Sequence, residues 1–290
     1  MSGIAEDVMP RALWSELRER HHGLVDPLIS PDRMSNPVES FLWTYYSYRP
    51  REVRRWHPGA LIHLEDAPEY KNRRGYGEYG PNVGVSRNFL EQRKSAIDFI
   101  YDLLSKTAAR PAFHGCFGMH EWAMVYQTEP EAIRHSKFPL RLGVETTNAL
   151  VEELGLKCTH YDAFRFFTPP ARPLNLIHPV REDQPLNEQP GCIHANMDLY
   201  KWTYKLAPIL PSDFTFAALN LARELREIDM RASPYDLSEL GYQAIRVESS
   251  EGRTEYVRFQ KEFAKRAQNL RLEMVAYLGK VQQLMANGNQ

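Results

Sequence analysis

The sequence predicts a mostly helical α+β fold, a single domain over residues 1–290 with a small β-sheet and long irregular loops. Several long segments carry apolar residues at three- and four-residue intervals, as amphipathic helices do. Few segments have the length and composition of strands, and stretches rich in glycine and proline separate the elements. No repeat or clean linker divides the chain. Residues 1–110 (N-terminal helices), 111–210 (candidate site) and 211–290 (C-terminal helices) are therefore parts of one domain.

The composition is that of a folded protein. Of the 290 residues, 43% are apolar and 25% charged, and the net charge of −1 gives no global positive field to attract nucleic acid. The N-terminus lacks a signal-peptide pattern, and no stretch approaches the ~20 apolar residues of a membrane span. Three cysteines, Cys116, Cys158 and Cys192, cannot build a disulfide framework and fit a reducing compartment. We expect a cytoplasmic protein with no membrane partner.

The N-terminal part begins with a short amphipathic helix over residues 7–22. Asn36 as cap and Pro37 at the first helical position predict a second helix through the aromatic run Phe41–Tyr48. The segment Arg51–Gly59 (REVRRWHPG) sets three arginines beside a tryptophan and a histidine. This mixture can bind phosphate and stack a base, and it also suits a solvated helix end, so both interpretations stay open.

A short strand is expected at Leu61–Leu64, followed by a long loop at Asp66–Ser86 that holds four glycines, two prolines and three tyrosines. Loops of this length are lids, binding loops or disordered segments. The GYGEYG spacing in this loop is not a nucleotide-binding fingerprint, because no convincing strand precedes it. Phe89–Leu104 is a clear amphipathic helix with Ser86 as its cap.

The middle of the chain mixes histidine, cysteine, carboxylate and aromatic residues. His114–Gly118 predicts a tight turn, and His120–Tyr126 opens a helix. Cys158–Phe167 is predicted as a strand of the small sheet, with Cys158, His160, Asp162, Phe164 and Phe166 on one face. Six prolines make Thr168–Pro190 an extended connector to a helix at Gly191–Leu206. One face of that helix carries His194, Asp198, Lys201 or Trp202, and Lys205.

The C-terminal part is predicted as two helices, 212–230 with Ser212 as cap and 251–281 with Ser250 as cap, separated by a brief strand at Ala244–Glu248. Together with the helix at 89–104, they are expected to pack against the sheet. The apolar stripe of the last helix is either core or the seam of a homodimer.

The first functional hypothesis is a metal site. His160 and Asp162 in adjacent pleats, joined by His194, would supply two imidazoles and one carboxylate, a set that leaves open positions on non-haem iron. Zinc is the alternative ion. His114 and His120 could replace a ligand, and Glu121 could act as general base.

The second hypothesis is hydrolysis of an N-glycosidic bond. It needs a carboxylate to position water, and the candidates are Asp198, Asp162 and Glu121. It also needs aromatic surfaces for a flipped, cationic base, and the substrate-binding candidates are Trp122, Tyr126, Tyr161, Trp202 and Lys201. A third possibility is a non-catalytic ligand-binding protein whose polar residues form a buried network.

Six segments, spread from about Asn36 to Phe263, resemble a bacterial family, frequent in actinobacteria, whose members are commonly labelled 3-methyladenine DNA glycosylase. They are HPG (57–59), FHGCFGMHEWAMVY (113–126), HSKFPLRLG (135–143), CTHYDAFRFFTPPARPLN (158–175), GCIHANMDLYKW (191–202) and EIDMRASPYDL (227–237). The resemblance implies a hydrolase that removes alkylated purines from DNA during repair, with alkylated DNA as its partner. The resemblance assigns no catalytic residue to this chain, because the sequence lacks the helix-hairpin-helix and helical-repeat patterns of characterised glycosylases. The residues themselves slightly favour a metalloenzyme with a small-molecule substrate.

Overall fold

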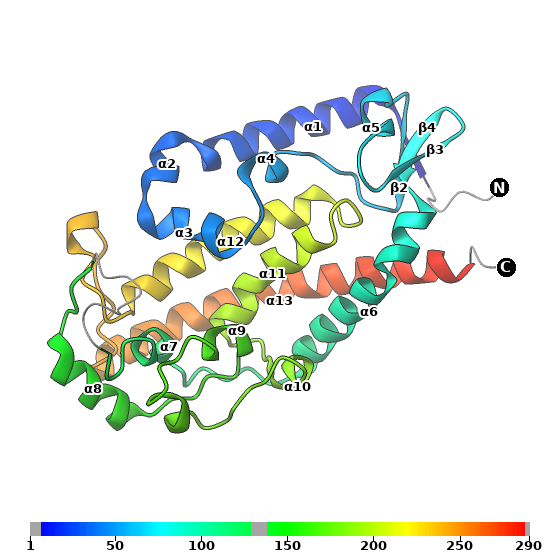
Figure 1. Cartoon of the computed structure of the whole chain (residues 1–290). Coiled ribbons are helices and arrows are strands. Elements are labelled where there is room, and N and C mark those ends of the chain that lie inside the picture. The colour runs from blue at the N-terminus through cyan, green and yellow to red at the C-terminus, as the bar shows by residue number, and fades with distance from the viewer. Residues whose placement is uncertain (1–6, 129–137, 288–290) are drawn as a thin grey trace. The chain divides into compact units, whose positions relative to one another are not determined.

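The computed structural model describes residues 7–128 and 138–287 (Figure 1). It confirms the predicted class, a mostly helical α+β protein with a small sheet. The described chain groups into two compact units. Unit 1 contains residues 7–105, 198–222 and 269–287, and unit 2 contains the described residues of 106–197 and 223–268. Four helices have residues in both units. The predicted division of a single domain into residues 1–110, 111–210 and 211–290 stays a prediction.

Unit 1 holds a four-stranded sheet of order β1-β2-β4-β3, made of β1 (Asp7–Met9), β2 (Ile62–Glu65), β3 (Tyr76–Tyr79) and β4 (Asn82–Val85). The pair β1 and β2 is parallel, whereas β4 is antiparallel to both of its neighbours. The predicted strand at Leu61–Leu64 is thus confirmed as β2. A buried hydrophobic cluster includes residues of this sheet and consists of Trp14, Trp56, Leu64, Ala67, Tyr70, Tyr76 and Val83.

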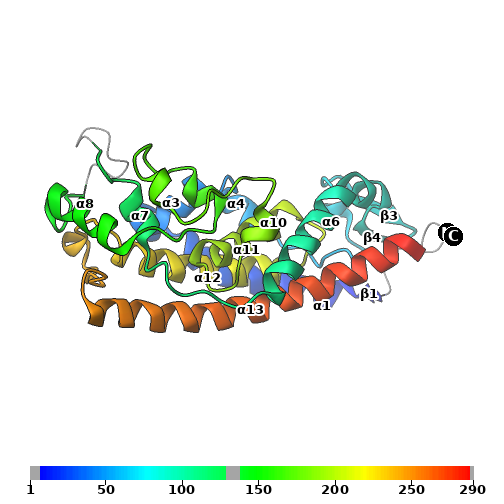
Figure 2. The ribbon, with the colours of Figure 1, turned by 90° about the horizontal axis from the view of Figure 1, so that it is seen from below.

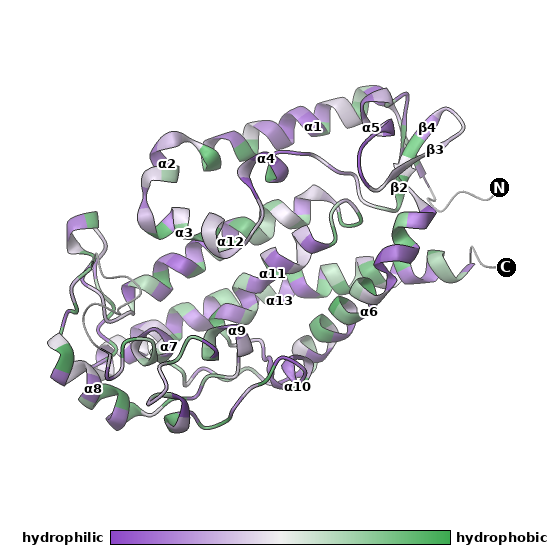
Figure 3. Cartoon of the chain, viewed as in Figure 1, coloured by the Kyte–Doolittle hydropathy of each residue, from purple (hydrophilic) through white to green (hydrophobic). Residues whose placement is uncertain are grey.

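Unit 1 shares the described N-terminal part of the chain between this sheet and six α-helices. They are α1 (Arg11–Val25), α2 (Pro31–Ser35), α3 (Pro37–Tyr45), α4 (Pro50–Val53), α5 (Pro68–Lys71) and most of α6 (Arg87–Ala109). As predicted, the Asn36 side chain caps α3, accepting hydrogen bonds from the amides of Val38 and Glu39. Ser86 likewise caps α6 through the Phe89 amide. The hydropathy stripe along α6 (Figure 3) matches its buried Leu90, Ile97, Ile100, Leu103 and Leu104.

The other helices are α7 (Met119–Ala123), α8 (Gly143–Leu154), α9 (Tyr161–Phe164), α10 (Gln184–Asn187), α11 (Ile193–Lys205), α12 (Ser212–Arg231) and α13 (Ser250–Asn287). The predicted helices at 191–206, 212–230 and 251–281 are confirmed. Within unit 1, the C-terminal part of α13 lies beside α6 in both Figure 1 and Figure 2, and Gln282 Nε2 donates to Asp98 Oδ1 at 2.7 Å. The apolar stripe of α13 is buried, as a core stripe is.

Two predicted caps are wrong. The hydroxyl of Ser212 accepts from the His57 amide and donates to the Arg55 carbonyl. Ser249, and not Ser250, caps α13 by accepting from the Gly252 amide.

The predicted loop at Asp66–Ser86 is wrong, because this segment forms α5 and the hairpin of β3 and β4. Its glycines serve a folded segment. Gly80 adopts a φ of 64° at the hairpin turn, and a β-carbon at Gly84 would clash with the ring of His63. The glycines of this segment therefore belong to a tight hairpin and do not indicate the irregular loop that was predicted.

The predicted strand at Cys158–Phe167 is also wrong, because this segment contains helix α9. His160 Nδ1 accepts from the Ala163 amide and so caps that helix. The backbone N–H and C=O of Cys158 bond to the side chain of Asn175, at 2.8 and 2.9 Å, so no neighbouring strand uses them. Alternating apolar residues over so short a segment do not separate a strand from a helical turn.

The predicted strand at Ala244–Glu248 is irregular, and the Ile245 amide donates to the Arg231 carbonyl instead. The predicted connector Thr168–Pro190 contains α10 and a 3-10 turn, Arg172–Leu174. The predicted helix from His120 ends at Ala123. Residues 135–137 of the segment at 135–143 lie outside the described residues. Among the described helices, none combines the length and apolarity that crossing a membrane requires.

Candidate metal centre

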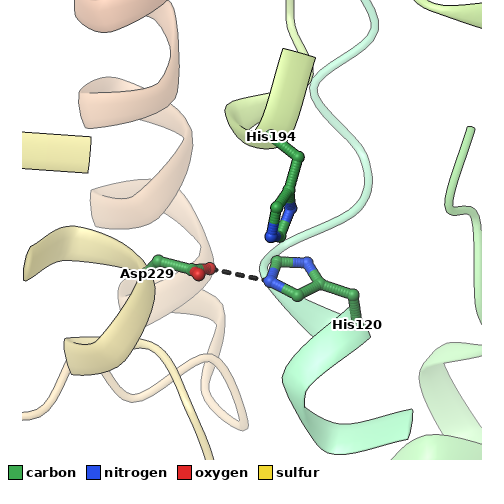
Figure 4. Close-up of side chains that lie close together, drawn as sticks. All are labelled: His120, His194 and Asp229. Atoms are coloured by element: carbon green, nitrogen blue, oxygen red, sulfur yellow. Dashed lines mark ion pairs between the residues drawn. The ribbon is translucent and has the colours of Figure 1, made fainter. Parts of the chain in front are cut away.

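Three helical segments in unit 2 bring two imidazoles and a carboxylate together (Figure 4). His120 comes from α7, His194 from the first turn of α11 and Asp229 from the last turns of α12. Each side chain offers one ligand atom, and these three atoms all lie within 4.8 Å of one another. We call these three residues the HHD cluster.

Local structure places His120 and His194. Gly118 has a φ of 72°, a conformation that glycine adopts without strain, and α7 begins directly after it. The start of α11 is held by Gln260, whose amide donates to the Gly191 carbonyl at 2.7 Å, and by Asn196, which donates to the Pro190 carbonyl. The two imidazole rings meet edge to face, with centroids 4.3 Å apart.

Asp229 is fully buried and has a partner on each oxygen. Its Oδ1 lies 2.8 Å from His120 Nε2, and its Oδ2 accepts from Arg226 Nη1 at 3.3 Å. The same Arg226 nitrogen donates to Glu121 Oε1 at 2.9 Å. Arg226 therefore orients two buried carboxylates, as the outer partners of metal ligands do.

The charges of the HHD cluster stabilise one another. Burial raises the pKa of Asp229, but the positive charges of His120, His194 and Arg226 lower it by more. The net shift of this pKa is downward, so the carboxylate stays ionised. Burial lowers the pKa of His120, but Asp229 raises it by more, and the net shift is upward. Two ligands about 2.1 Å from one ion lie roughly 3–3.5 Å apart, so small side-chain movements would bring these atoms onto a divalent ion.

A narrow cavity adjoins the two histidines. It offers about 20 Å³, which is enough for one water-sized molecule. Its lining consists of Cys116, Met119, His120, Leu156, Lys157, Cys158, Thr159, Phe167, Gln189, Cys192, Ile193 and His194. Burial raises the pKa of all three thiols, that of Cys158 to about 12, so they stay protonated at neutral pH. The neutral thiols therefore add no charge to the lining of the cavity.

Of the sequence-predicted metal ligands, His120 and His194 belong to the HHD cluster. The ring of His160 stacks on that of His194, with centroids 5.5 Å apart; its Nδ1 caps α9 and its Nε2 lies 3.3 Å from Glu188 Oε1. Asp162 is half-buried and pairs with Arg165 at 3.2 Å. His114 is half-buried and is not among the converging ligand atoms.

The other predicted catalytic carboxylates are buried. Glu121 lies beside the HHD cluster, and its Oε2 is a buried atom with no hydrogen-bond partner in the described chain. Asp198, in unit 1, accepts from the Tyr46 hydroxyl and from Lys201 Nζ, each at 2.9 Å. Each oxygen of Asp198 thus accepts one hydrogen bond.

The predicted substrate-binding aromatic residues have structural contacts. Trp122 is fully buried, and its indole N–H donates to the Ala232 carbonyl. Tyr126 donates to Glu152, and Tyr161 is half-buried. Trp202 is buried, with the ammonium group of Lys201 4.6 Å from its ring centroid.

Asp229 and Arg226 are not among the residues predicted for the site, although the sequence carries a signal for Asp229. Ala218, Ala222 and Leu225 are buried at four- and three-residue intervals, and Asp229 continues that series after four more residues. A carboxylate on the apolar stripe of a helix is costly to bury unless it is paired.

No protein-family model matches the chain, and no curated protein or solved structure gives a significant match. The resemblance to the family labelled 3-methyladenine DNA glycosylase stays a prediction.

Proposed function

We propose that the protein is a metal-dependent enzyme that acts on a small molecule, with His120, His194 and Asp229 as the ligands of a divalent iron or zinc ion. The observation that carries the proposal is the convergence of these three buried side chains from three helices. Two imidazoles and one carboxylate suit both ions and leave coordination positions open for water and substrate.

The surrounding residues supply what such a site requires. A bound divalent ion polarises an oxygen atom or lowers the pKa of water. Glu121 Oε2 is a buried carboxylate oxygen with no hydrogen-bond partner in the described chain, so it can accept a proton. Arg226 keeps the Glu121 and Asp229 carboxylates in fixed orientations. The small neighbouring cavity has room for a water-sized ligand.

The glycosylase activity that the resemblance implies has less support. Its preferred carboxylate, Asp198, is engaged on both oxygens by Tyr46 and Lys201. A cytoplasmic location also stays a proposal, whereas the apolar stripe of the C-terminal helix is buried within the chain and gives a homodimer through that helix no support.

Elemental analysis of protein purified without chelator tests the proposed function. We expect near-stoichiometric iron or zinc in the wild type, and loss of the metal in His194→Ala and Asp229→Asn. His178→Ala, which removes an exposed histidine of the same unit, is the matched control and should keep the metal. A metal-free wild type from metal-replete cells, with chelator-insensitive release of methylated bases from alkylated DNA, would replace this proposal by the glycosylase one.

A further inference from the structure

A second cavity, of about 250 Å³, lies in unit 1 and is lined largely by basic and aromatic side chains. We call it the basic cavity. Its lining consists of Tyr48, Glu52, Arg55, His57, Arg73, Arg74, Phe89, Arg93, Tyr204, Lys205, Ala207 and Pro208. Five of these side chains are cationic and one is a carboxylate. The near-neutral chain therefore concentrates positive charge at this place.

The single carboxylate leaves most of these cations without an acidic partner. Glu52 pairs with Arg55 at 2.6 Å and with Arg51 at 3.1 Å. No ion pair to Arg73, Arg74 or Arg93 occurs among residues 7–128 and 138–287. Three unpaired guanidinium groups around one cavity repel one another, and an anion would relieve that repulsion.

Two of these arginines are held in place by other contacts. The guanidinium of Arg73 lies over the ring of Tyr70, 4.2 Å from its centroid, and its Nε donates to the Glu69 carbonyl at 3.0 Å. Arg93 donates to the Lys205 carbonyl, while its Nε is buried and has no hydrogen-bond partner in the described chain. A buried donor without an acceptor is unfavourable, and a ligand oxygen would satisfy it.

The aromatic lining completes the site. The rings of Tyr48 and Tyr204 are stacked, with centroids 4.8 Å apart and planes at 9°. His57 Nδ1 shares a hydrogen bond with the Tyr76 hydroxyl, 2.8 Å away. Burial is the main cause that lowers the pKa of His57 to about 3, and the positive charges of Arg73 and Arg55 lower it as well. A neutral His57 is consistent with a positive potential in the cavity.

We propose that the basic cavity binds the phosphate group of a small phosphate monoester. Phosphate carries close to two negative charges at neutral pH, and planar guanidinium groups bind its oxygens in pairs. The volume exceeds that of phosphate alone but is below that of most drug-sized pockets, which suits a phosphorylated small molecule. This inference is independent of the proposed metal centre, since it uses no residue of the HHD cluster.

The sequence predicts part of this site. Arg55 and His57 belong to the segment Arg51–Gly59, for which phosphate binding was one of two open interpretations. Arg73 and Arg74 lie in the turn between α5 and β3, and Arg93 lies on α6, so the sequence alone did not join them to Arg51–Gly59.

Calorimetric titration of the full chain at constant ionic strength tests the proposal, with inorganic phosphate and AMP as probes. We expect the double variant Arg74→Gln/Arg93→Gln to bind both probes about tenfold more weakly or worse, because two charged donors are removed. Lys94→Gln is the matched control. It removes one positive charge next to Arg93 on α6, but Lys94 pairs with Asp98 and does not line the cavity.

Three outcomes would overturn the proposal. They are a wild type that binds neither probe, a double variant that binds like the control, and a single-stranded oligonucleotide that binds more tightly than AMP. The third result would assign the cavity to a polynucleotide backbone. If the double variant misfolds, the single variant Arg74→Gln decides, because Arg74 is exposed and contributes little to packing.

Discussion

At the residue scale, the central feature is Arg226, a buried cation between two buried carboxylates. Its side chain is 3% exposed and lies within 3.3 Å of Glu121 and Asp229. Such groups depend on one another, because each charge is tolerable in the interior only while its partners are present. The cluster is therefore sensitive to the loss of any one member.

We expect Arg226→Ala to lower the free energy of unfolding by about 3–5 kcal/mol, because it leaves two buried carboxylates without their cation. Urea denaturation measures this change. Arg266→Ala is the control, since Arg266 and Glu224 form an exposed pair, and its loss should cost less than about 1 kcal/mol. Equal effects of the two substitutions would contradict the assigned role of Arg226.

His57 should make stability depend on pH. Its pKa in the folded protein, about 3, lies below its ordinary value of 6.5. Between these values the unfolded chain binds a proton at this imidazole and the folded chain does not. The free energy of unfolding should therefore fall as the pH decreases from about 6.5 towards 3, by at most roughly 1.4 kcal/mol per pH unit.

The substitution His57→Gln, which can keep a hydrogen bond to Tyr76, should flatten this pH dependence. Thermal unfolding in phosphate-free buffers between pH 4 and pH 7 gives the comparison. Parallel curves for wild type and variant would show that His57 is not responsible.

At the scale of elements, hydrophobic periodicity predicted the long helices, whereas short elements depended on contacts that the sequence does not display. The stripe of α6 and the Asn36 cap of α3 are local signals, and both predictions are confirmed. Helix α9 and the β3–β4 hairpin depend on distant partners. Asn175 satisfies the backbone of Cys158, and the ring of His63 requires the glycine at 84.

The same limit applies to the candidate site. His120, His194 and Glu121 were found from residue type, because imidazoles and carboxylates stand out in apolar segments. His160 and Asp162 were paired with His194 because a strand was expected. The structure does stack the rings of His160 and His194, with centroids 5.5 Å apart, but Asp162 lies in α9 and pairs with Arg165. Asp229 lies far along the chain from both histidines, and only the packing of α12 beside α7 and α11 joins them.

The capping role of His160 leads to a prediction. His160→Ala should destabilise the protein by about 1 kcal/mol or more, because α9 loses its cap and Glu188 loses a partner. His160→Asn retains a capping acceptor and should recover part of that loss. Both variants should retain the metal, which elemental analysis checks. Loss of metal in His160→Asn would instead make His160 a ligand.

At the scale of the whole molecule, a metal that binds only the folded state should raise the melting temperature. Dialysis against a chelator should lower this temperature, and adding back iron or zinc should restore it. The variant Asp229→Asn should melt at the same temperature with and without chelator. A chelator effect of equal size in wild type and variant would contradict binding at the HHD cluster.

The division into two units has a consequence for biosynthesis. Unit 1 is assembled from residues 7–105, 198–222 and 269–287, and unit 2 from segments that alternate with them along the chain. During translation, the sheet and α1 emerge from the ribosome long before the part of α13 that packs against α6. Neither unit can mature as an independent nascent domain, so the emerging chain must wait, partly folded and with apolar surface exposed, for its last helix. Chaperone demand during synthesis is the expected cost of this interleaved order.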